Sequence, residues 1–237
     1  MRILVVGMGL IGGSICKSIK AATSHAVYGC DVQQAVLDDA IADGAIDGTG
    51  TMTDGTYDMI ILCLHQRIAI QMVQEALPKI PAGTILVDTC GLKGRMVRDL
   101  TYRCRKADVR YVGTHPMAGR EKNGYYASIP NLFQNANLIV TPVDGTDEAA
   151  LDAVKELADQ MGFGKIVTAT PMWHDNMIAY TSQLAHVVSS SYVKDFCMDD
   201  ALSFSGGSFQ DMTRVATMDE SMWAALFLDN RDNLLYH

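Results

Sequence analysis

A glycine-rich turn directly after a short apolar run near the N-terminus constrains the fold of this 237-residue chain more than any other feature. Residues 3–6 are apolar and mostly β-branched, which predicts a buried strand. Gly7, Gly9 and Gly12 follow at the spacing Gly-x-Gly-x-x-Gly, and a helix is expected to begin near Leu10. In dinucleotide-binding folds, such glycines allow the tight turn, the close approach of a pyrophosphate and the packing of the helix against the strand.

The glycine turn alone also fits an ordinary strand–helix connection, but the next predicted strand, residues 26–31, ends in an acid. Asp31 lies 19 residues after Gly12, where a carboxylate binds the adenosine ribose hydroxyls in dinucleotide-binding folds. No Lys or Arg occurs between Asp31 and Arg67 to neutralise a 2′-phosphate, which favours NAD over NADP. We therefore expect these residues to contact NAD: Gly7, Gly9, Leu10, Ile11, Gly12 and Asp31.

The composition is that of a globular chain, with 49% hydrophobic and 19% charged residues. A formal net charge of −8 without basic runs argues against binding to nucleic acid or anionic membranes. No apolar run reaches the length of a membrane span. The six cysteines show no Cys-x-x-Cys spacing, which predicts reduced thiols and a cytoplasmic protein.

Predicted strands and helices alternate through the first two thirds of the chain, ending with a strand, a helix and a strand in residues 138–169. This alternation predicts an α/β fold with a Rossmann-type, doubly wound parallel sheet. After Pro171 a long segment without Gly or Pro predicts a helix, and two further helical segments follow it. We therefore expect an NAD-binding Rossmann domain over residues 1–169 and a smaller, all-helical domain over residues 170–237.

Ligands of a doubly wound sheet lie beyond the carboxyl ends of its strands. Three segments of this chain fall at that edge, namely His65, residues 89–93 and residues 114–119. We expect His65, Thr89 and Gly91 to contribute to the cofactor site.

A histidine lies in the segment Gly-Thr-His-Pro-Met-Ala-Gly, directly after a predicted strand ending at Gly113. A loop histidine commonly caps its neighbours. His115, however, is followed by Glu121 and Lys122 in a glycine-rich loop over the expected cofactor crevice. That setting favours a functional side chain.

The long helical segment after Pro171 carries a second polar group. Asp175 and His186 are 11 residues apart, which puts them within about 20° on a wheel of about 100° per residue, and Ser182 shares their face. This stripe indicates a ligand-facing surface, and a hydrogen-bonded core histidine is the alternative. His174 and His186 point about 120° apart, so we expect no metal site.

An arginine follows the glycine-rich turn that begins at Ser205. The guanidinium of Arg214 suits bidentate binding of a carboxylate. Considered alone, this arginine is better explained by a surface salt bridge.

Together these segments resemble the prephenate/arogenate dehydrogenase family of tyrosine biosynthesis. The resemblance covers nearly the whole chain. The combination of the His-Pro-Met-Ala-Gly and Asp-Met-Thr-Arg segments is specific, whereas the glycine loop is not. The matching segments are residues 5–14, 87–94, 113–122, 174–175, 182–186, 206–214 and 222–223.

The resemblance implies roles for six side chains. His115 matches the catalytic histidine, which accepts the proton of the C4 hydroxyl of the substrate ring. Arg214 matches an arginine that binds a substrate carboxylate, and His186 matches a second histidine on the substrate side. The other matches are two acids of an ionic network around that arginine and an aromatic residue near the pocket: Glu121, Asp175 and Trp223.

The implied activity is NAD-dependent oxidative decarboxylation of prephenate to 4-hydroxyphenylpyruvate, or of arogenate to tyrosine. The ring C4–H leaves as hydride and the C1 carboxylate leaves as CO₂, which makes the ring aromatic. One alternative is another two-domain dehydrogenase, such as a lysine-dependent 3-hydroxyacid dehydrogenase, but the long helical segment has no Lys before Lys194. A second alternative is a non-catalytic NAD-sensing module.

The chain departs from the family pattern at two places. Gly91 stands where many members carry a serine that orients the histidine and contacts the nicotinamide, so Thr89, Thr114 or a water would have to take that role. The helical domain is also shorter than is usual in the family. The resemblance implies a homodimer that forms through this domain.

Overall fold

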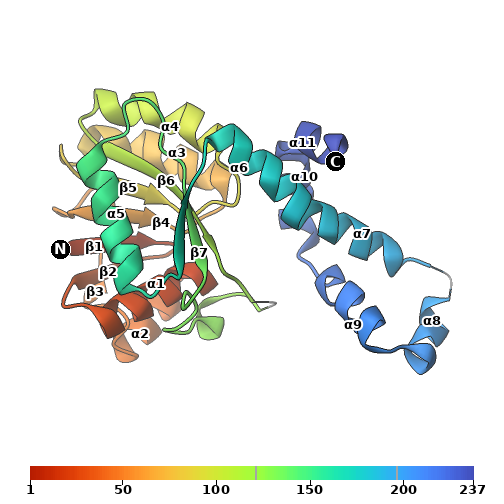
Figure 1. Cartoon of the computed structure of the whole chain (residues 1–237). Coiled ribbons are helices and arrows are strands. Elements are labelled where there is room, and N and C mark those ends of the chain that lie inside the picture. Colours follow the sequence, from red (N-terminus) through yellow and green to blue (C-terminus); the bar gives the residue numbers. More distant parts are fainter. Residues whose placement is uncertain (121, 196) are drawn as a thin grey trace. The chain divides into compact units, whose positions relative to one another are not determined.

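The computed structural model describes residues 1–120, 122–195 and 197–237. The chain divides into two compact units, Met1–Pro171 and Met172–His237. Figure 1 shows the first unit as a sheet with flanking helices and the second, coloured from teal to blue, as helices.

The first unit is built on one sheet, which in the described residues has eight strands in the order β3-β2-β1-β4-β5-β6-β7-β8. The order reverses between β1 and β4, which is the switch point where doubly wound sheets bind ligands. The strands are Arg2–Val6 (β1), Ala26–Cys30 (β2), Gly48–Thr49 (β3), Met59–Leu62 (β4), Ile85–Asp88 (β5), Arg110–Met117 (β6), Asn137–Val140 (β7) and Lys165–Thr168 (β8).

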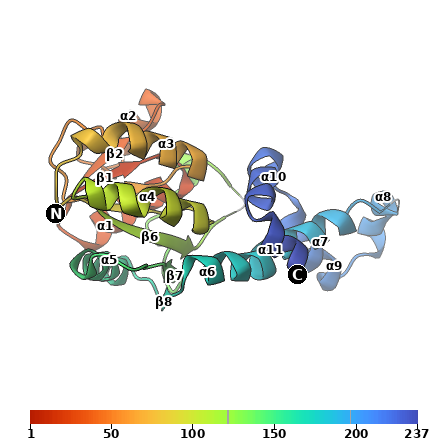
Figure 2. The same cartoon turned by 90° about the horizontal axis from the view of Figure 1, so that it is seen from above.

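Five helices in the described part of this unit connect the strands, and they lie on both faces of the sheet (Figure 2). They are Leu10–Ala22 (α1), Gln34–Ala42 (α2), Gln66–Ala76 (α3), Gly94–Lys106 (α4) and Glu148–Gln160 (α5).

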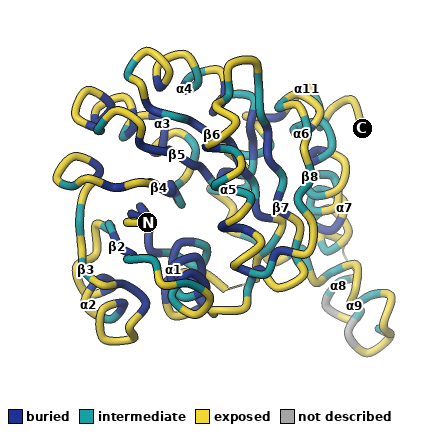
Figure 3. The backbone as a smooth tube through the Cα atoms, turned by 60° about the vertical axis from the view of Figure 1, so that its left-hand side comes forward, coloured by how far each residue is buried: buried dark blue, intermediate teal, exposed yellow. Residues whose placement is uncertain are grey.

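The core follows the two-residue period of the strands. In β1, Ile3 and Val5 pack in one apolar cluster with side chains of α1, α2 and α5. Leu4 and Val6 pack on the opposite face in a second cluster, with side chains of α3 and α4. The central strands β1, β4 and β5 are therefore buried on both faces and the helices are exposed outwards, as Figure 3 shows. This confirms the predicted Rossmann-type fold.

Two expectations for this unit need correction. The sheet is not wholly parallel, because β7 runs antiparallel to β6. Strand β6 also does not end at Gly113 but continues to Met117, so His115 lies within the strand, opposite Ile139 of β7, rather than on a loop after it. The β5–β6 ladder ends at the pair Asp88–Gly113, and beyond it β6 is held by β7 alone among the described strands.

The second unit is helical, as the sequence predicts. Pro171–Ile178 (α6) begins at the expected proline and continues through a π-helical turn, Ala179–Gln183, into Leu184–Tyr192 (α7). The remaining helices are Met198–Ala201 (α8), Gly207–Thr213 (α9), Glu220–Asp229 (α10) and Arg231–Tyr236 (α11). Asp219 caps α10, since its carboxylate accepts a hydrogen bond from the Met222 N–H at 2.8 Å.

The π-helical turn lies between Asp175 and His186. A π turn holds more residues than an α turn, so side chains that follow it are rotated away from the face that regular periodicity predicts. The helical wheel that put Asp175, Ser182 and His186 on one face assumed an uninterrupted α-helix, and that assumption is wrong here.

Candidate functional site

The glycine loop has the tight geometry that its sequence predicts. Gly7 has a φ of 93°, and a Cβ atom added to it would lie 2.5 Å from the carbonyl oxygen of Cys63. A Cβ on Gly12 would lie 1.9 Å from the carbonyl oxygen of Gly7. Side chains larger than hydrogen are therefore excluded at both positions, because the loop would have to open to accept them.

Gly9 differs from these two glycines, because a Cβ added there would meet no described atom within 4 Å. Gly9 is the N-cap of α1, and no described side chain caps that helix end. Open space therefore lies beside Gly9 at the start of α1, where Leu10 and Ile11 follow. A helix N-terminus of this kind binds phosphate groups through N–H donors and the helix dipole.

Asp31 directly follows β2, and its carboxylate is oriented by the glycine loop itself. The Met8 N–H donates to Asp31 Oδ2 at 2.7 Å, and the Gln33 N–H donates to Oδ1 at 2.9 Å. Each carboxylate oxygen can accept further hydrogen bonds. The glycine loop and Asp31, separated by α1 in the sequence, thus form one continuous site that fits a pyrophosphate and a ribose.

The other residues predicted at the cofactor site lie at the carboxyl ends of β4 and β5. His65 is exposed and is the N-cap of α3. Thr89 follows β5 and donates through its hydroxyl to the Leu62 carbonyl at 3.1 Å. Gly91 lies in the bend between β5 and α4. Contacts of these three residues with a cofactor stay predictions.

The cysteine thiols near the glycine loop are poor nucleophiles. Cys63 follows β4, with its backbone against Gly7, and burial raises the pKa of its thiol to about 12. Burial also raises the pKa of the Cys90 thiol well above its ordinary value, and the nearby Asp88 carboxylate adds to that rise. Because the thiolate is the nucleophile, these thiols are unreactive at neutral pH.

His115 is half-buried and lies on β6 two residues beyond the end of the β5–β6 ladder. The loop after β6 begins with Ala118 and Gly119, and Arg120, which follows them, donates to the Ala127 carbonyl at 3.0 Å. Glu121, predicted from the resemblance to join an ionic network, lies outside the described residues.

A buried ion pair beside His115 was not anticipated by the sequence reasoning. The side chains of Lys93 and Asp88 are both 0% exposed, and Lys93 Nζ donates to Asp88 Oδ1. The same Nζ donates to the Thr114 carbonyl, one residue before His115. The available signal was an Asp at the end of an apolar strand with a Lys five residues later, because buried charges usually occur in pairs.

In the helical unit, His186 contacts Trp223 and the residue that follows Arg214. His186 lies against the ring of Trp223, with centroids 3.7 Å apart, and its Nδ1 lies 2.8 Å from the Val215 carbonyl oxygen. Arg214 directly precedes Val215 and is the C-cap of α9. The carbonyl contact assigns the hydrogen of a neutral His186 to Nδ1, which leaves Nε2 as an acceptor.

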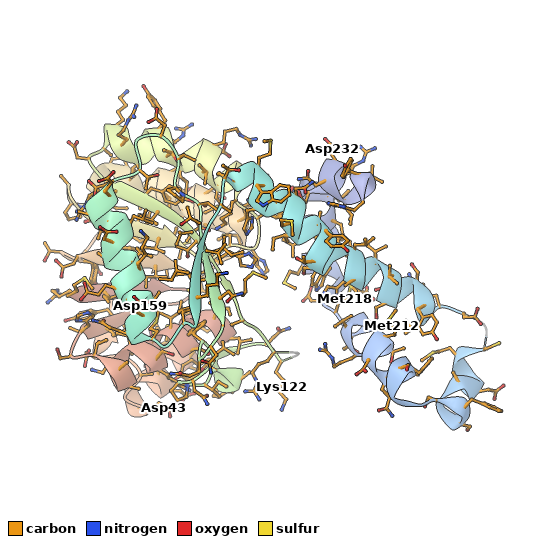
Figure 4. The ribbon with its side chains drawn as sticks, viewed as in Figure 1. Asp43, Lys122, Asp159, Met212, Met218 and Asp232 are labelled. Atoms are coloured by element: carbon orange, nitrogen blue, oxygen red, sulfur yellow. The ribbon has the colours of Figure 1, made fainter. Side chains whose placement is uncertain are left out.

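The chain segments around His186 are tied to α7 by side chains of that helix. Ser189 donates to the Met212 carbonyl at 2.6 Å, and the Ser190 hydroxyl lies 3.9 Å from the Met218 sulfur. Figure 4 labels both methionines, one on α9 and the other before α10. These contacts hold the turn that carries Arg214 beside His186.

Asp175 makes a different set of contacts. Its carboxylate lies 2.8 Å from Nδ1 of His174, a side chain that is itself fully buried. Its backbone carbonyl accepts a hydrogen bond from Asn230 at 2.8 Å. The predicted pairing of Asp175 with Arg214 stays a prediction.

No helix in the described residues is long and apolar enough to cross a membrane. No group of three or more His, Cys, Asp or Glu side chains in that part of the chain could hold a metal ion.

Comparison with known proteins assigns both units to one family. Residues 15–168 match the nucleotide-binding domain of prephenate dehydrogenase, and residues 170–237 match the dimerization domain of prephenate dehydrogenase. This chain belongs to the prephenate dehydrogenase family. The family assignment confirms the resemblance on which the predicted site residues rest.

Individual relatives span the whole chain. The cyclohexadienyl dehydrogenase of Zymomonas mobilis is 31% identical and aligns with 99% of this chain and 82% of its own length. A crystal structure of prephenate dehydrogenase from A. aeolicus, in complex with hydroxyphenyl propionate and NAD⁺, is 29% identical. It superposes with a TM-score of 0.85 over 100% of this chain and 85% of the other.

The prephenate dehydrogenase of Bacillus subtilis is 29% identical over 98% of this chain. The present chain covers 65% of that relative's length. The activity, substrates and partners of the full-length relatives are therefore only proposed for this chain.

Proposed function

We propose that this chain is an NAD-dependent dehydrogenase that oxidises and decarboxylates prephenate or arogenate, in the route to tyrosine. One observation carries the proposal, namely the consecutive matches to the nucleotide-binding and dimerization domains of prephenate dehydrogenase. The geometry of the glycine loop and of Asp31 supports the cofactor part independently of the family assignment.

In this proposal the glycine loop and the N-terminus of α1 hold the pyrophosphate of NAD. The Asp31 carboxylate, already oriented by the Met8 N–H, accepts hydrogen bonds from the adenosine ribose. When bound, NAD supplies the acceptor for the hydride that leaves C4 of the substrate ring. The relative from A. aeolicus with NAD⁺ bound supports the choice of cofactor.

His115 would act as the general base. A neutral imidazole accepts the proton of the C4 hydroxyl as the hydride leaves, and the C1 carboxylate departs as CO₂ so that the ring becomes aromatic. A positioned base of this kind contributes about 10²–10⁴-fold to the rate. The strand position of His115 supports this role, because a side chain on a paired strand is held more rigidly than one on a loop.

Arg214 would bind a substrate carboxylate, and His186 and Trp223 would line the same substrate subsite. Their gathering within the helical unit supports a common role. Asp175 and Glu121 would complete the ionic surroundings of Arg214.

We also propose that the protein is a homodimer formed through the helical unit, and that it is cytoplasmic. Bulky apolar side chains are exposed in that unit, and the dimerization-domain match covers it. They include Met172, Trp173, Tyr180, Phe204, Leu228, Leu235 and Tyr236. The six free cysteines support a reducing compartment. A molar mass by light scattering equal to that of one chain would contradict the dimer.

The activity is tested by incubating the purified protein with NAD and either prephenate or arogenate, and by recording NADH absorbance. We expect NADH to form with at least one of the two, and the ratio of the two kcat/KM values then identifies the preferred substrate. NAD binding without turnover of either would favour the NAD-sensing module. Turnover of a 3-hydroxyacid instead would favour the other dehydrogenase class.

A further inference from the structure

The buried ion pair Asp88–Lys93 joins the end of β5 to the start of α4, across the segment that carries Thr89 and Gly91. Asp88 is the last residue of β5, and Lys93 is the N-cap of α4. Both side chains are fully buried. A charged pair taken entirely out of water is retained only where good geometry and additional hydrogen bonds compensate for the lost hydration.

Those additional hydrogen bonds are present. Asp88 Oδ1 also accepts from the Cys90 N–H at 2.9 Å, and Asp88 Oδ2 accepts from the Tyr111 hydroxyl at 2.6 Å. The Thr114 hydroxyl donates to the Asp88 backbone carbonyl at 2.6 Å. The pair thus binds β5, the segment after it and β6 into one network.

The second contact of Lys93 lies where the sheet ladder stops. The β5–β6 ladder ends at Asp88–Gly113, so the Thr114 carbonyl falls one residue beyond the last paired position. Lys93 Nζ donates to this carbonyl. The ammonium group therefore takes the place of β5 beside Thr114, whose other strand neighbour is Val140 of β7.

The same pair closes the segment that carries Thr89 and Gly91. Asp88 and Lys93 are the two ends of that segment, and the ion pair joins them directly. Thr89 fastens the segment to β4 through the Leu62 carbonyl, and Cys90 Sγ lies 3.4 Å from the Leu64 carbonyl oxygen. The segment is thus held on one side to β4 and on the other to β6.

We propose that Lys93 is a positioning residue. Through its contacts with Asp88 and with the Thr114 carbonyl, it holds the segment 89–91 after β5 and His115 on β6 in fixed positions relative to each other. The inference rests on the proposed function, because it assigns Lys93 a role in the geometry of that reaction. It gives Lys93 no contact with substrate. It also provides a physical reason why this chain can do without a serine at Gly91, since the buried network performs the orienting task.

The decisive comparison distinguishes two roles of Lys93, namely holding β6 at the Thr114 carbonyl and neutralising the buried carboxylate of Asp88. Lys93→Met alone leaves the Asp88 carboxylate buried without its cation and is expected to lose stability. In the double variant Lys93→Met/Asp88→Asn both charges are absent, while the amide can still accept from the Cys90 N–H. Lys20→Met is the matched control, because Lys20 pairs with Asp47 at 2.6 Å on the surface.

If Lys93 only neutralises Asp88, the double variant should regain both the thermal stability and the kcat of the wild type. If Lys93 positions His115, the double variant should regain stability but keep a kcat lower by about tenfold or more, because small misplacements of reacting groups are costly. The KM for substrate should stay within about threefold, since the groups proposed to bind it are untouched. The KM for NAD should rise, because the variant also loosens the segment that carries Thr89 and Gly91. Lys20→Met should match the wild type throughout.

Amide hydrogen exchange of the peptide containing residues 113–117 gives a readout that does not depend on activity. Exchange there should be faster in the double variant than in the wild type or in Lys20→Met. A stable double variant with wild-type kcat and wild-type exchange would overturn the positioning role. If the wild type shows no turnover, the proposed function fails, and the exchange comparison alone decides whether Lys93 holds the strand end.

A milder variant keeps the test decisive if the double variant does not fold. Thr114→Val retains the β-branched shape and removes only the hydroxyl that donates to the Asp88 carbonyl. It should lower kcat by about threefold or more with little change in KM, for the same reason of misplacement. Wild-type kcat in a folded Thr114→Val protein would then count against the network.

Discussion

The proposed roles of Asp31 and His115 depend on different physical properties, namely charge for Asp31 and basicity for His115. Asp31 is held by two backbone N–H groups, so its carboxylate has a fixed direction before any ligand arrives. His115 is half-buried on a strand. Substitutions that preserve size can therefore separate the chemical property of each side chain from its packing.

We predict that Asp31→Ser reduces the ratio of kcat/KM for NAD to kcat/KM for NADP by about tenfold or more. The carboxylate repels the 2′-phosphate of NADP, and removal of about 1.4 kcal/mol of repulsion changes this ratio tenfold. The measurement is kcat/KM for both cofactors. Asp58→Ser is the matched control, because Asp58 also accepts a backbone hydrogen bond, from the Arg2 N–H at 2.7 Å, but at the amino end of β1. Equal use of both cofactors by the wild type would contradict the role of Asp31.

We predict that His115→Asn lowers kcat by about 10²-fold or more, because an amide cannot accept the hydroxyl proton. The dissociation constant for NAD should stay nearly unchanged. In the wild type, kcat should fall as the pH is lowered, since a protonated imidazole cannot act as a base, and the variant should lose this dependence. His25→Asn, a change beside the N-terminal ammonium group, should leave kcat unaltered. Near-normal kcat in His115→Asn would place the proton acceptor elsewhere.

Single residues also show the limit of reasoning from the sequence. The glycine spacing and Asp31 could be predicted because their roles depend on local backbone geometry and on a fixed spacing. The role of Lys93 could not, because it depends on the Thr114 carbonyl, 21 residues away, being left beyond the end of a ladder. From the sequence, Lys93 is simply the residue before a basic helix.

Among the larger elements, the strands were the most predictable, because strands buried on both faces are continuous apolar runs. The extension of β6 to Met117 was not, since Gly113 and Pro116 are typical of strand ends. It exists because β7 returns antiparallel and pairs with it. Beyond Gly113 the ladder with β5 has ended, so Pro116 occupies an edge position, where proline is tolerated.

The π-helical turn had no sequence signal, because it contains neither Gly nor Pro. Tertiary contacts account for it. Gln183, at its last position, is 1% exposed and donates to the Leu226 carbonyl of α10 at 3.0 Å. Asn230, also buried, donates to Gln183 Oε1 at 2.8 Å and to the Asp175 carbonyl at 2.8 Å. This amide network fixes the rotation between the parts of the helix that carry Asp175 and His186.

We predict that Gln183→Met lowers the unfolding free energy of the helical unit by about 1–3 kcal/mol, since buried polar groups lose their partners. Both tryptophans, Trp173 and Trp223, lie in this unit, so their fluorescence in a urea titration reports its unfolding. Thr181→Ala, at an exposed position of the same turn, is the control and should change the midpoint little. A Gln183→Met midpoint equal to that of the wild type would show that the network is dispensable.

For the molecule as a whole, the central question is whether the two units contribute to one active site. Each unit carries a set of the predicted residues, with the nucleotide-binding residues and His115 in the first and the substrate-side residues in the second. The family assignment covers both units. A substitution in the helical unit that alters substrate affinity without altering NAD affinity would join the two sets functionally.

Arg214 provides that test, because about a hundred residues separate it from His115. Prephenate enters as a dianion, and a guanidinium can hold a carboxylate with two parallel hydrogen bonds that an ammonium group cannot reproduce. Arg214 is exposed in this structure; once a bound substrate covers the pair, loss of one partner costs about 2–5 kcal/mol. We therefore predict that Arg214→Ala raises the KM for substrate by about 30-fold or more, while the dissociation constant for NAD stays within a few-fold.

The measurement is a substrate titration at saturating NAD, with circular dichroism to check folding. Arg214→Lys should recover part of the loss, because it restores the charge but not the bidentate geometry. Arg231→Ala, which removes an exposed arginine at the start of α11, is the matched control and should behave as the wild type. An unchanged KM in a folded Arg214→Ala protein would remove Arg214 from the substrate site and return it to the alternative of a surface salt bridge. A raised KM with unchanged NAD affinity would instead assign substrate recognition to the helical unit and cofactor binding to the sheet.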